Sequence, residues 1–166
     1  PSKLFSIKKI KNKNIKKIFL SFGGYDQKKI KDKLISFIKK NKSFHFSNMA
    51  NLNQKKFEKR SHFFKSMIQS DLVICSGGLT MFDAINFNKI TIVTSQFKHQ
   101  IKNILRMKKK GTIIYLKDIN KPTINKALIE LNDTKKINNL YQNMKKYNKS
   151  DKMNIIINKI YKLYAN

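Results

Sequence analysis

The sequence predicts an α/β fold built on a parallel, doubly wound sheet. Two observations lead to this prediction. Short apolar segments alternate with longer amphipathic ones, and two of the apolar segments end in a Gly-Gly turn that opens a helix. Strands that alternate with helices favour a parallel sheet with crossover helices on both faces. No internal repeat or linker divides the chain, so we expect one domain over 1–166, with 1–14 as a basic lead-in or linker.

Three strands and two helices are expected in the amino-terminal half. The strands are 15–22, 43–46, where apolar and polar residues alternate, and 71–75. The last is a continuous apolar run, which is typical of a strand buried on both faces of a parallel sheet. The helices are 27–40 and 57–69, because apolar residues recur there at helical spacing.

The carboxyl-terminal half continues the alternation. Strands are expected at 90–94, which is rich in β-branched residues, and at 112–116. Gly111 is the expected cap at the end of the helix that precedes the second of these strands. The expected helices are 79–87, 99–109, 122–131, 135–147 and 151–164.

Both glycine turns stand where a doubly wound sheet binds ligands, beyond the carboxyl ends of its strands. Glycine lets the backbone approach a phosphate, and the following helix directs free N–H groups at the anion. Two such turns suit a diphosphate, although each glycine pair can also serve only a tight strand-to-helix turn. The residues expected to hold the diphosphate are Gly23, Gly24, Tyr25, Ser76, Gly77, Gly78, Leu79 and Thr80.

Three polar residues follow the strands at the same expected edge. Asp83 lies early in its helix, where a carboxylate can accept hydrogen bonds from the hydroxyls of a ribose. An acidic residue favoured by the helix dipole is the alternative. His99 and Gln100 open another helix and are expected to contact a sugar or phosphate, with solvated polar side chains as the alternative. Neither glycine turn is a dinucleotide or P-loop motif, so redox cofactors and ATP are disfavoured and no cofactor is expected.

The sequence resembles a known family over roughly residues 15–160. Residues 18–26, IFLSFGGYD, are similar to the "sFGGsDp" segment of the pseudaminic-acid-pathway UDP-sugar hydrolases and their spore-coat-polysaccharide relatives (PseG/SpsG-like). Residues 67–83, MIQSDLVICSGGLTMFD, resemble that family's "elmaeaDlaIsagGtTlyE". His99-Gln100 matches Asn-Gln there, and His-Gln in the related lipid-linked N-acetylglucosaminyltransferases (MurG-like). Asp151 stands where the hydrolases carry "DGkGaeRI".

The resemblance implies a Rossmann-like domain, the carboxyl-terminal half of a GT-B fold, which holds most of a UDP-sugar. The turn from Ser76 to Thr80 would meet the diphosphate, and Asp83 would hold the ribose. The family's catalytic histidine belongs to an amino-terminal half that is absent here, so no catalytic residue is expected in this chain. The implied parent enzyme hydrolyses a UDP-sugar to free sugar and UDP, in surface polysaccharide or nonulosonic acid biosynthesis. The second hypothesis is that the parent enzyme is a glycosyltransferase.

The sequence also departs from this family. Asp83 replaces a glutamate, and Asn88 and Ile90 replace a glycine and a proline. In the terminal motif, Lys152 and Asn154 replace glycines, and no arginine stands at Ile157. These departures motivate a third reading, a divergent domain without catalytic function.

The net charge of +28 would ordinarily indicate a nucleic-acid partner. We disfavour that reading because Lys, Asn and Ile make up nearly half of the chain, as codon bias alone can produce. Arginine, the preferred reader of bases and phosphates, occurs only at Arg60 and Arg106. A Lys-rich surface can still bind anionic lipid, and the expected helix 151–164 can be taken as interfacial. A face left open by the missing domain can also form a homodimer.

The single cysteine, Cys75, excludes an internal disulfide, and the three histidines lack metal-ligand spacing. No metal is therefore expected, and the cytoplasm is the expected compartment. No apolar run approaches the ~20 residues that span a bilayer. The basic start lacks the apolar stretch of a signal peptide. Because the first residue is Pro1 rather than Met, we expect a processed chain or a piece of a longer protein.

Overall fold

The computed structural model describes residues 15, 17–23, 26, 29–40, 48–50 and 60–149. These residues form a five-stranded sheet and six helices, which alternate with the strands up to α5 and end with α6. The elements are β1 (Lys17–Ser21), α1 (Ile30–Lys40), β2 (Asn48–Ala50), α2 (Arg60–Ile68), β3 (Leu72–Ser76), α3 (Leu79–Asn86), β4 (Ile90–Thr94), α4 (Lys98–Lys109), β5 (Ile114–Leu116), α5 (Lys121–Asn132) and α6 (Thr134–Lys149).

All strand pairs are parallel, and the strand order is β2-β1-β3-β4-β5. The chain leaves β1 towards one edge and returns past it to form β3 and the strands beyond. The direction of winding therefore reverses between β1 and β3, which is the point where doubly wound sheets bind ligands. The predicted parallel, doubly wound sheet is confirmed.

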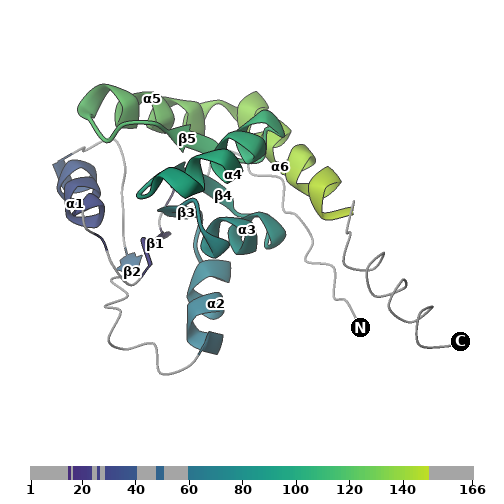
Figure 1. Cartoon of the computed structure of the whole chain (residues 1–166), viewed down its shortest axis with the longest axis horizontal. Coiled ribbons are helices and arrows are strands. Elements are labelled where there is room, and N and C mark those ends of the chain that lie inside the picture. Colours follow the sequence, from purple (N-terminus) through teal and green to yellow (C-terminus); the bar gives the residue numbers. More distant parts are fainter. Residues whose placement is uncertain are drawn as a thin grey trace, which may run out of the picture.

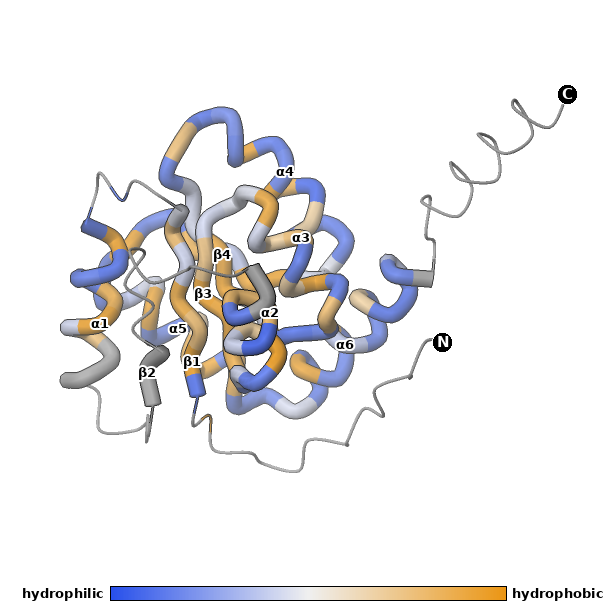
Figure 2. The backbone as a smooth tube through the Cα atoms, turned by 90° about the horizontal axis from the view of Figure 1, so that it is seen from below, coloured by the Kyte–Doolittle hydropathy of each residue, from blue (hydrophilic) through white to orange (hydrophobic). Residues whose placement is uncertain are grey.

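The helices cover both faces of the sheet. Helices α1 and α5 lie on one side, and α2, α3 and α4 lie on the other (Figures 1 and 2). Strands β3 and β4 are buried along their whole length, and the central strands are the orange, hydrophobic part of the tube in Figure 2. The ring of Phe19 meets that of Phe63 edge to face at 5.0 Å between centroids, which packs α2 onto β1.

The two inner strands are tied together where they begin. The backbone N–H of Lys17 donates to the Asp71 carboxylate at 2.9 Å, and the N–H of Asp71 donates to the Lys17 carbonyl at 2.8 Å. These bonds fix the register of β1 against β3. The charge of Asp71 acts electrostatically on the side chain of Tyr141 in α6. Burial, followed by that charge, raises the pKa of the Tyr141 phenol to about 12.

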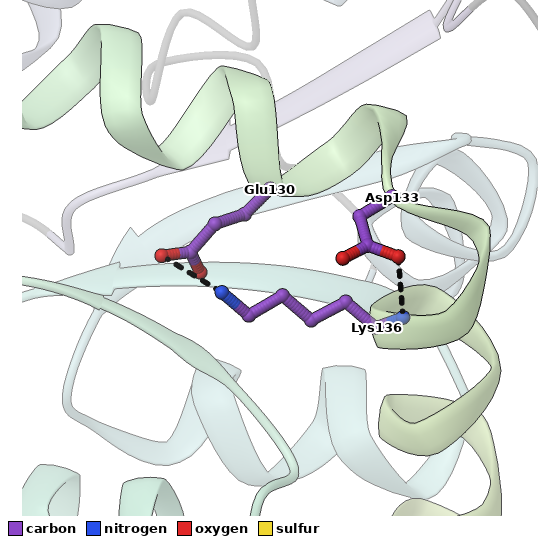
Figure 3. A network of polar contacts seen from close by, with 3 residues as sticks. All are labelled: Glu130, Asp133 and Lys136. Carbon is purple, nitrogen blue, oxygen red and sulfur yellow. Dashed lines mark hydrogen bonds and ion pairs between the residues drawn. The ribbon is translucent and has the colours of Figure 1, made fainter.

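The corner between α5 and α6 is held by short-range polar contacts (Figure 3). Asp133 accepts from the backbone N–H of Lys136 at 3.1 Å and so caps the first turn of α6. The Lys136 ammonium lies 3.2 Å from the Glu130 carboxylate. These contacts bring α6 back along α5 and against α3 and β4.

Most expected elements agree with the structure to within a few residues. The second strand lies at Asn48–Ala50, whereas the expected strand 43–46 falls outside the described residues. The expected helix 151–164, the lead-in 1–14 and the start of helix 57–69 also lie outside them. Gly111 follows the α4 cap residue, Lys110, with a φ of 65°, as expected for a glycine that ends a helix. Of the part described, no helix is long and apolar enough to cross a membrane.

Candidate functional site

Three loops meet at the carboxyl edge of the sheet, because β1, β3 and β4 are parallel neighbours. The loop after β1 contains Gly23 and Asp26, and the loop after β3 is Gly77-Gly78. The loop after β4 runs from Ser95 to Phe97 and opens α4. The two glycine turns thus follow adjacent strands on either side of the switch point. Gly24 and Tyr25, both expected to bind UDP, lie outside the described residues.

The first glycine turn leads to α1, whose amino-terminal N–H groups are already bonded by a side chain of the chain itself. Gly23 has a φ of 74°, which glycine adopts without the steric cost of a Cβ. Asp26 then accepts from the backbone N–H of Ile30 at 3.0 Å and of Lys31 at 2.8 Å. A carboxylate of the chain itself therefore occupies the anion position at the start of α1.

The second glycine turn uses its two glycines differently. A Cβ on Gly77 would lie 2.5 Å from the Ile104 Cδ1 atom and 3.2 Å from the Gln100 Cβ atom, so glycine lets α4 approach the turn. A Cβ on Gly78 would meet nothing within 4 Å. Gly78 is the cap residue of α3, and among the described residues α3 has no side-chain cap hydrogen bond. The start of α3 therefore combines open space beside Gly78 with a helix end that has no side-chain cap, which suits an anion.

Helix α4 begins in the same way. Its cap residue is Phe97, no side chain caps it, and its first turn holds no acidic residue. By contrast, Asn120 caps α5 by accepting from the Thr123 N–H at 3.0 Å, and Asp133 caps α6. The two helices that start after β3 and β4 thus present uncapped, positive ends at one edge of the sheet. The exposed ammonium of Lys98 lies in the first turn of α4.

The loops after β1 and β4 are joined by a polar network. Gln100 is buried, and its side-chain oxygen accepts from the Gln96 backbone N–H at 3.0 Å. The Gln96 side-chain amide donates to the Asp26 carboxylate at 3.3 Å. Gln100, an expected sugar or phosphate contact, therefore supports the loop that carries Gln96. His99 is exposed, and its ring stacks on that of Phe97 with 5.5 Å between centroids.

The remaining candidates of the second turn differ in exposure. Ser76 is buried at the end of β3, Thr80 is half-buried, and Leu79 leaves 82% of its surface exposed. Asp83 is half-buried one turn further along α3. Burial raises the pKa of the neighbouring Cys75 thiol well above its usual range, and the Asp83 charge adds to this effect. Cys75 is therefore a buried core residue whose raised pKa favours the protonated thiol.

The sequence does not predict a functional role for two residues of this edge, Asp26 and Gln96. Asp26 and Gln96 form a hydrogen bond across 70 positions, which no local pattern reveals. Only Asp26 has a sequence feature that indicates a role. It follows a Gly-Gly turn, and an Asp at such a position often caps the next helix. Of the residues described, no group of three His, Cys, Asp or Glu side chains can hold a metal ion.

The architecture and the edge define a Rossmann-like α/β domain of the kind that makes up one half of a GT-B protein. Among solved structures, the chain is similar to the glycosyltransferase of kitacinnamycin, with a TM-score of 0.58 and 11% sequence identity. The match covers 96% of this chain and 47% of the glycosyltransferase, so the chain spans about half of that protein. No protein-family model and no curated protein matches the sequence.

Replacing Gly77 with alanine should destabilise the domain, because the new methyl group would enter the space of Ile104. We expect a loss of about 1–3 kcal/mol in the free energy of unfolding, as for other overpacked sites. Gly78→Ala is the matched control, since its methyl group meets open space. Urea denaturation of both variants measures the difference, and equal losses would contradict the close approach of α4.

Replacing Gln100 with alanine removes the acceptor of the buried Gln96 N–H. We expect the free energy of unfolding to fall by about 1–3 kcal/mol, the usual cost of leaving such a group without a partner. His99→Ala, at the exposed neighbouring position, should stay within about 0.5 kcal/mol of the original protein. If the two variants unfold at the same urea concentration, the side chain of Gln100 has no supporting role.

Proposed function

We propose that this chain is the UDP-sugar-binding domain of a sugar-nucleotide enzyme, and that it forms the carboxyl-terminal half of a GT-B protein. The observation that carries the proposal is the uncapped start of α3 beside the switch point. The similar glycosyltransferase supports a nucleotide-sugar ligand for this fold. The resemblance of residues 67–83 to UDP-sugar hydrolases supplies uridine as the nucleoside.

In this proposal the diphosphate lies at the start of α3, against Gly78 and the backbone N–H groups of Leu79 and Thr80. The start of α1 is a poorer position, because Asp26 already accepts its N–H groups and repels an anion. The two glycine turns are therefore unequal, and only the second receives phosphate. The uncapped start of α4 and the Lys98 ammonium add positive potential on the other side of the ligand.

The ribose is assigned to Asp83, one turn along α3 from the proposed phosphate position. The effect of its charge on Cys75, near the end of β3, supports a carboxylate close to the carboxyl edge. Asp83 is half-buried, so part of its side chain is accessible to a ligand. Its hydrogen bonds to a sugar diol would be charge-assisted, which makes them stronger than neutral ones.

The family resemblance favours hydrolysis of the UDP-sugar, with the reacting groups on an amino-terminal domain. Transfer to an acceptor is the second candidate, and the similar glycosyltransferase favours it. Both reactions place the same demand on this half, namely to hold the nucleotide. A single cysteine supports the cytoplasm as the compartment.

UDP added to this chain should bind in a calorimetric titration, and Asp83→Ala should weaken binding at least about tenfold. The factor corresponds to losing hydrogen bonds to a charged group, about 1.5–3 kcal/mol. Asp83→Glu keeps the carboxylate and should bind within a few-fold of the original chain. Asp133→Asn removes the same charge at the α5–α6 corner and should have no effect. An absence of binding at millimolar UDP would exclude the proposal.

A protein that joins this chain to a catalytic amino-terminal half should release UDP from a UDP-sugar. Hydrolysis predicts release at the same rate with and without candidate acceptors, whereas transfer predicts an acceptor-dependent rate. Coupled detection of UDP measures both, with the Asp83→Ala variant as the matched control. Release unchanged by Asp83→Ala would contradict the assigned ribose contact.

A further inference from the structure

Helix α4 carries an exposed apolar stripe that packing within the domain leaves unused. Its buried residues are Gln100, Ile104 and Met107. Beside them, Phe97 and Ile101 are each 36% exposed and Leu105 is 49% exposed. These three residues recur every four positions, so they form one row along the helix. Most other exposed large apolar side chains stand singly, as is ordinary on a protein surface.

Cations flank this row on its outer side. Residues 98–110 contain no acidic residue, and Lys98, Lys102 and Lys109 are all exposed. Lys102 lies one helical turn before Leu105, and Lys109 lies one turn after it, so both border the apolar row. Arg106 and Lys108 add further exposed positive charge to the same helix, and the cap residue Lys110 adds more at its end. The α4 surface therefore consists of an apolar row with an uncompensated cationic border.

We propose that this α4 surface, formed by Phe97, Ile101, Leu105, Lys102 and Lys109, docks on an anionic lipid bilayer. An apolar row beside a lysine-rich border is the arrangement of helices that lie in the plane of a membrane interface. The apolar side chains enter the boundary between headgroups and acyl chains, while the ammonium groups contact lipid phosphates. A nucleic-acid backbone offers the same charge but no apolar layer for Ile101 and Leu105.

Docking through α4 has a consequence for the candidate site. The helix starts at the carboxyl edge of the sheet, where the loop from β4 reaches Phe97. A bilayer that contacts α4 therefore lies next to the edge where the nucleotide is proposed to bind. The docking itself does not depend on that nucleotide, so the two proposals can fail separately.

A single tryptophan tests the contact directly, because the chain contains no tryptophan. Leu105→Trp should shift its emission to the blue on vesicles of phosphatidylcholine with about a third of phosphatidylglycerol, and brominated acyl chains should quench it. Ile129→Trp is the matched control, since Ile129 is 69% exposed on α5. It should show neither effect. Equal shifts at both positions, or none at Leu105→Trp, would overturn the proposal.

Sedimentation with the same vesicles separates local docking from general charge. The pair Lys102→Gln and Lys109→Gln should weaken partitioning by more than tenfold, at about fivefold per charge. The pair Lys121→Gln and Lys126→Gln removes the same charge from α5 and should weaken it much less. Ile101→Ser with Leu105→Ser should cost about tenfold without a change of charge. Equal losses for both lysine pairs, or α4 variants that weaken duplex DNA binding but not vesicle binding, would contradict docking through α4.

Discussion

The close packing of α4 against Gly77 is the contact on which the arrangement of the carboxyl edge depends. The missing Cβ lets the buried Ile104 side chain enter the turn after β3. The same approach sets the position of Gln100, whose side chain holds the loop after β4. That loop in turn bonds Asp26 through Gln96. One absent methyl group thus fixes the relation of three loops that come from β1, β3 and β4.

The starts of α1, α3, α4, α5 and α6 divide into two groups with different consequences, whereas the residue before α2 lies outside the described residues. Asp26, Asn120 and Asp133 satisfy the first turns of α1, α5 and α6. No side chain caps α3 or α4, which begin after the neighbouring strands β3 and β4. Each uncapped start leaves N–H groups that water or an anion must satisfy. Two such starts side by side give the edge a positive potential that depends on backbone geometry, in addition to the lysine charge.

The strands and most helices could be predicted from the sequence, because burial on both faces leaves a continuous apolar run such as β3 or β4. The details of the candidate site were harder to predict from the sequence. Gly23 and Gly77 occur in similar motifs, yet one provides a positive φ and the other provides space for Ile104. Only tertiary packing distinguishes these uses. Gln100 could be placed at the right edge, but its inward hydrogen bond to Gln96 depends on the loop conformation.

Composition hides the α4 surface in the same way. With a net charge of +28, lysines occur on almost every segment, so a cationic border has no contrast in the sequence. Apolar periodicity does not reveal the row either, because Ile101 and Leu105 continue the pattern of the buried Ile104 and Met107. Only side-chain exposure separates the two sets. The helix has more apolar surface than its packing on the sheet can bury, and the excess lies beside its cations. The position of this apolar surface beside the cations, rather than the total charge, favours a lipid surface over other polyanions.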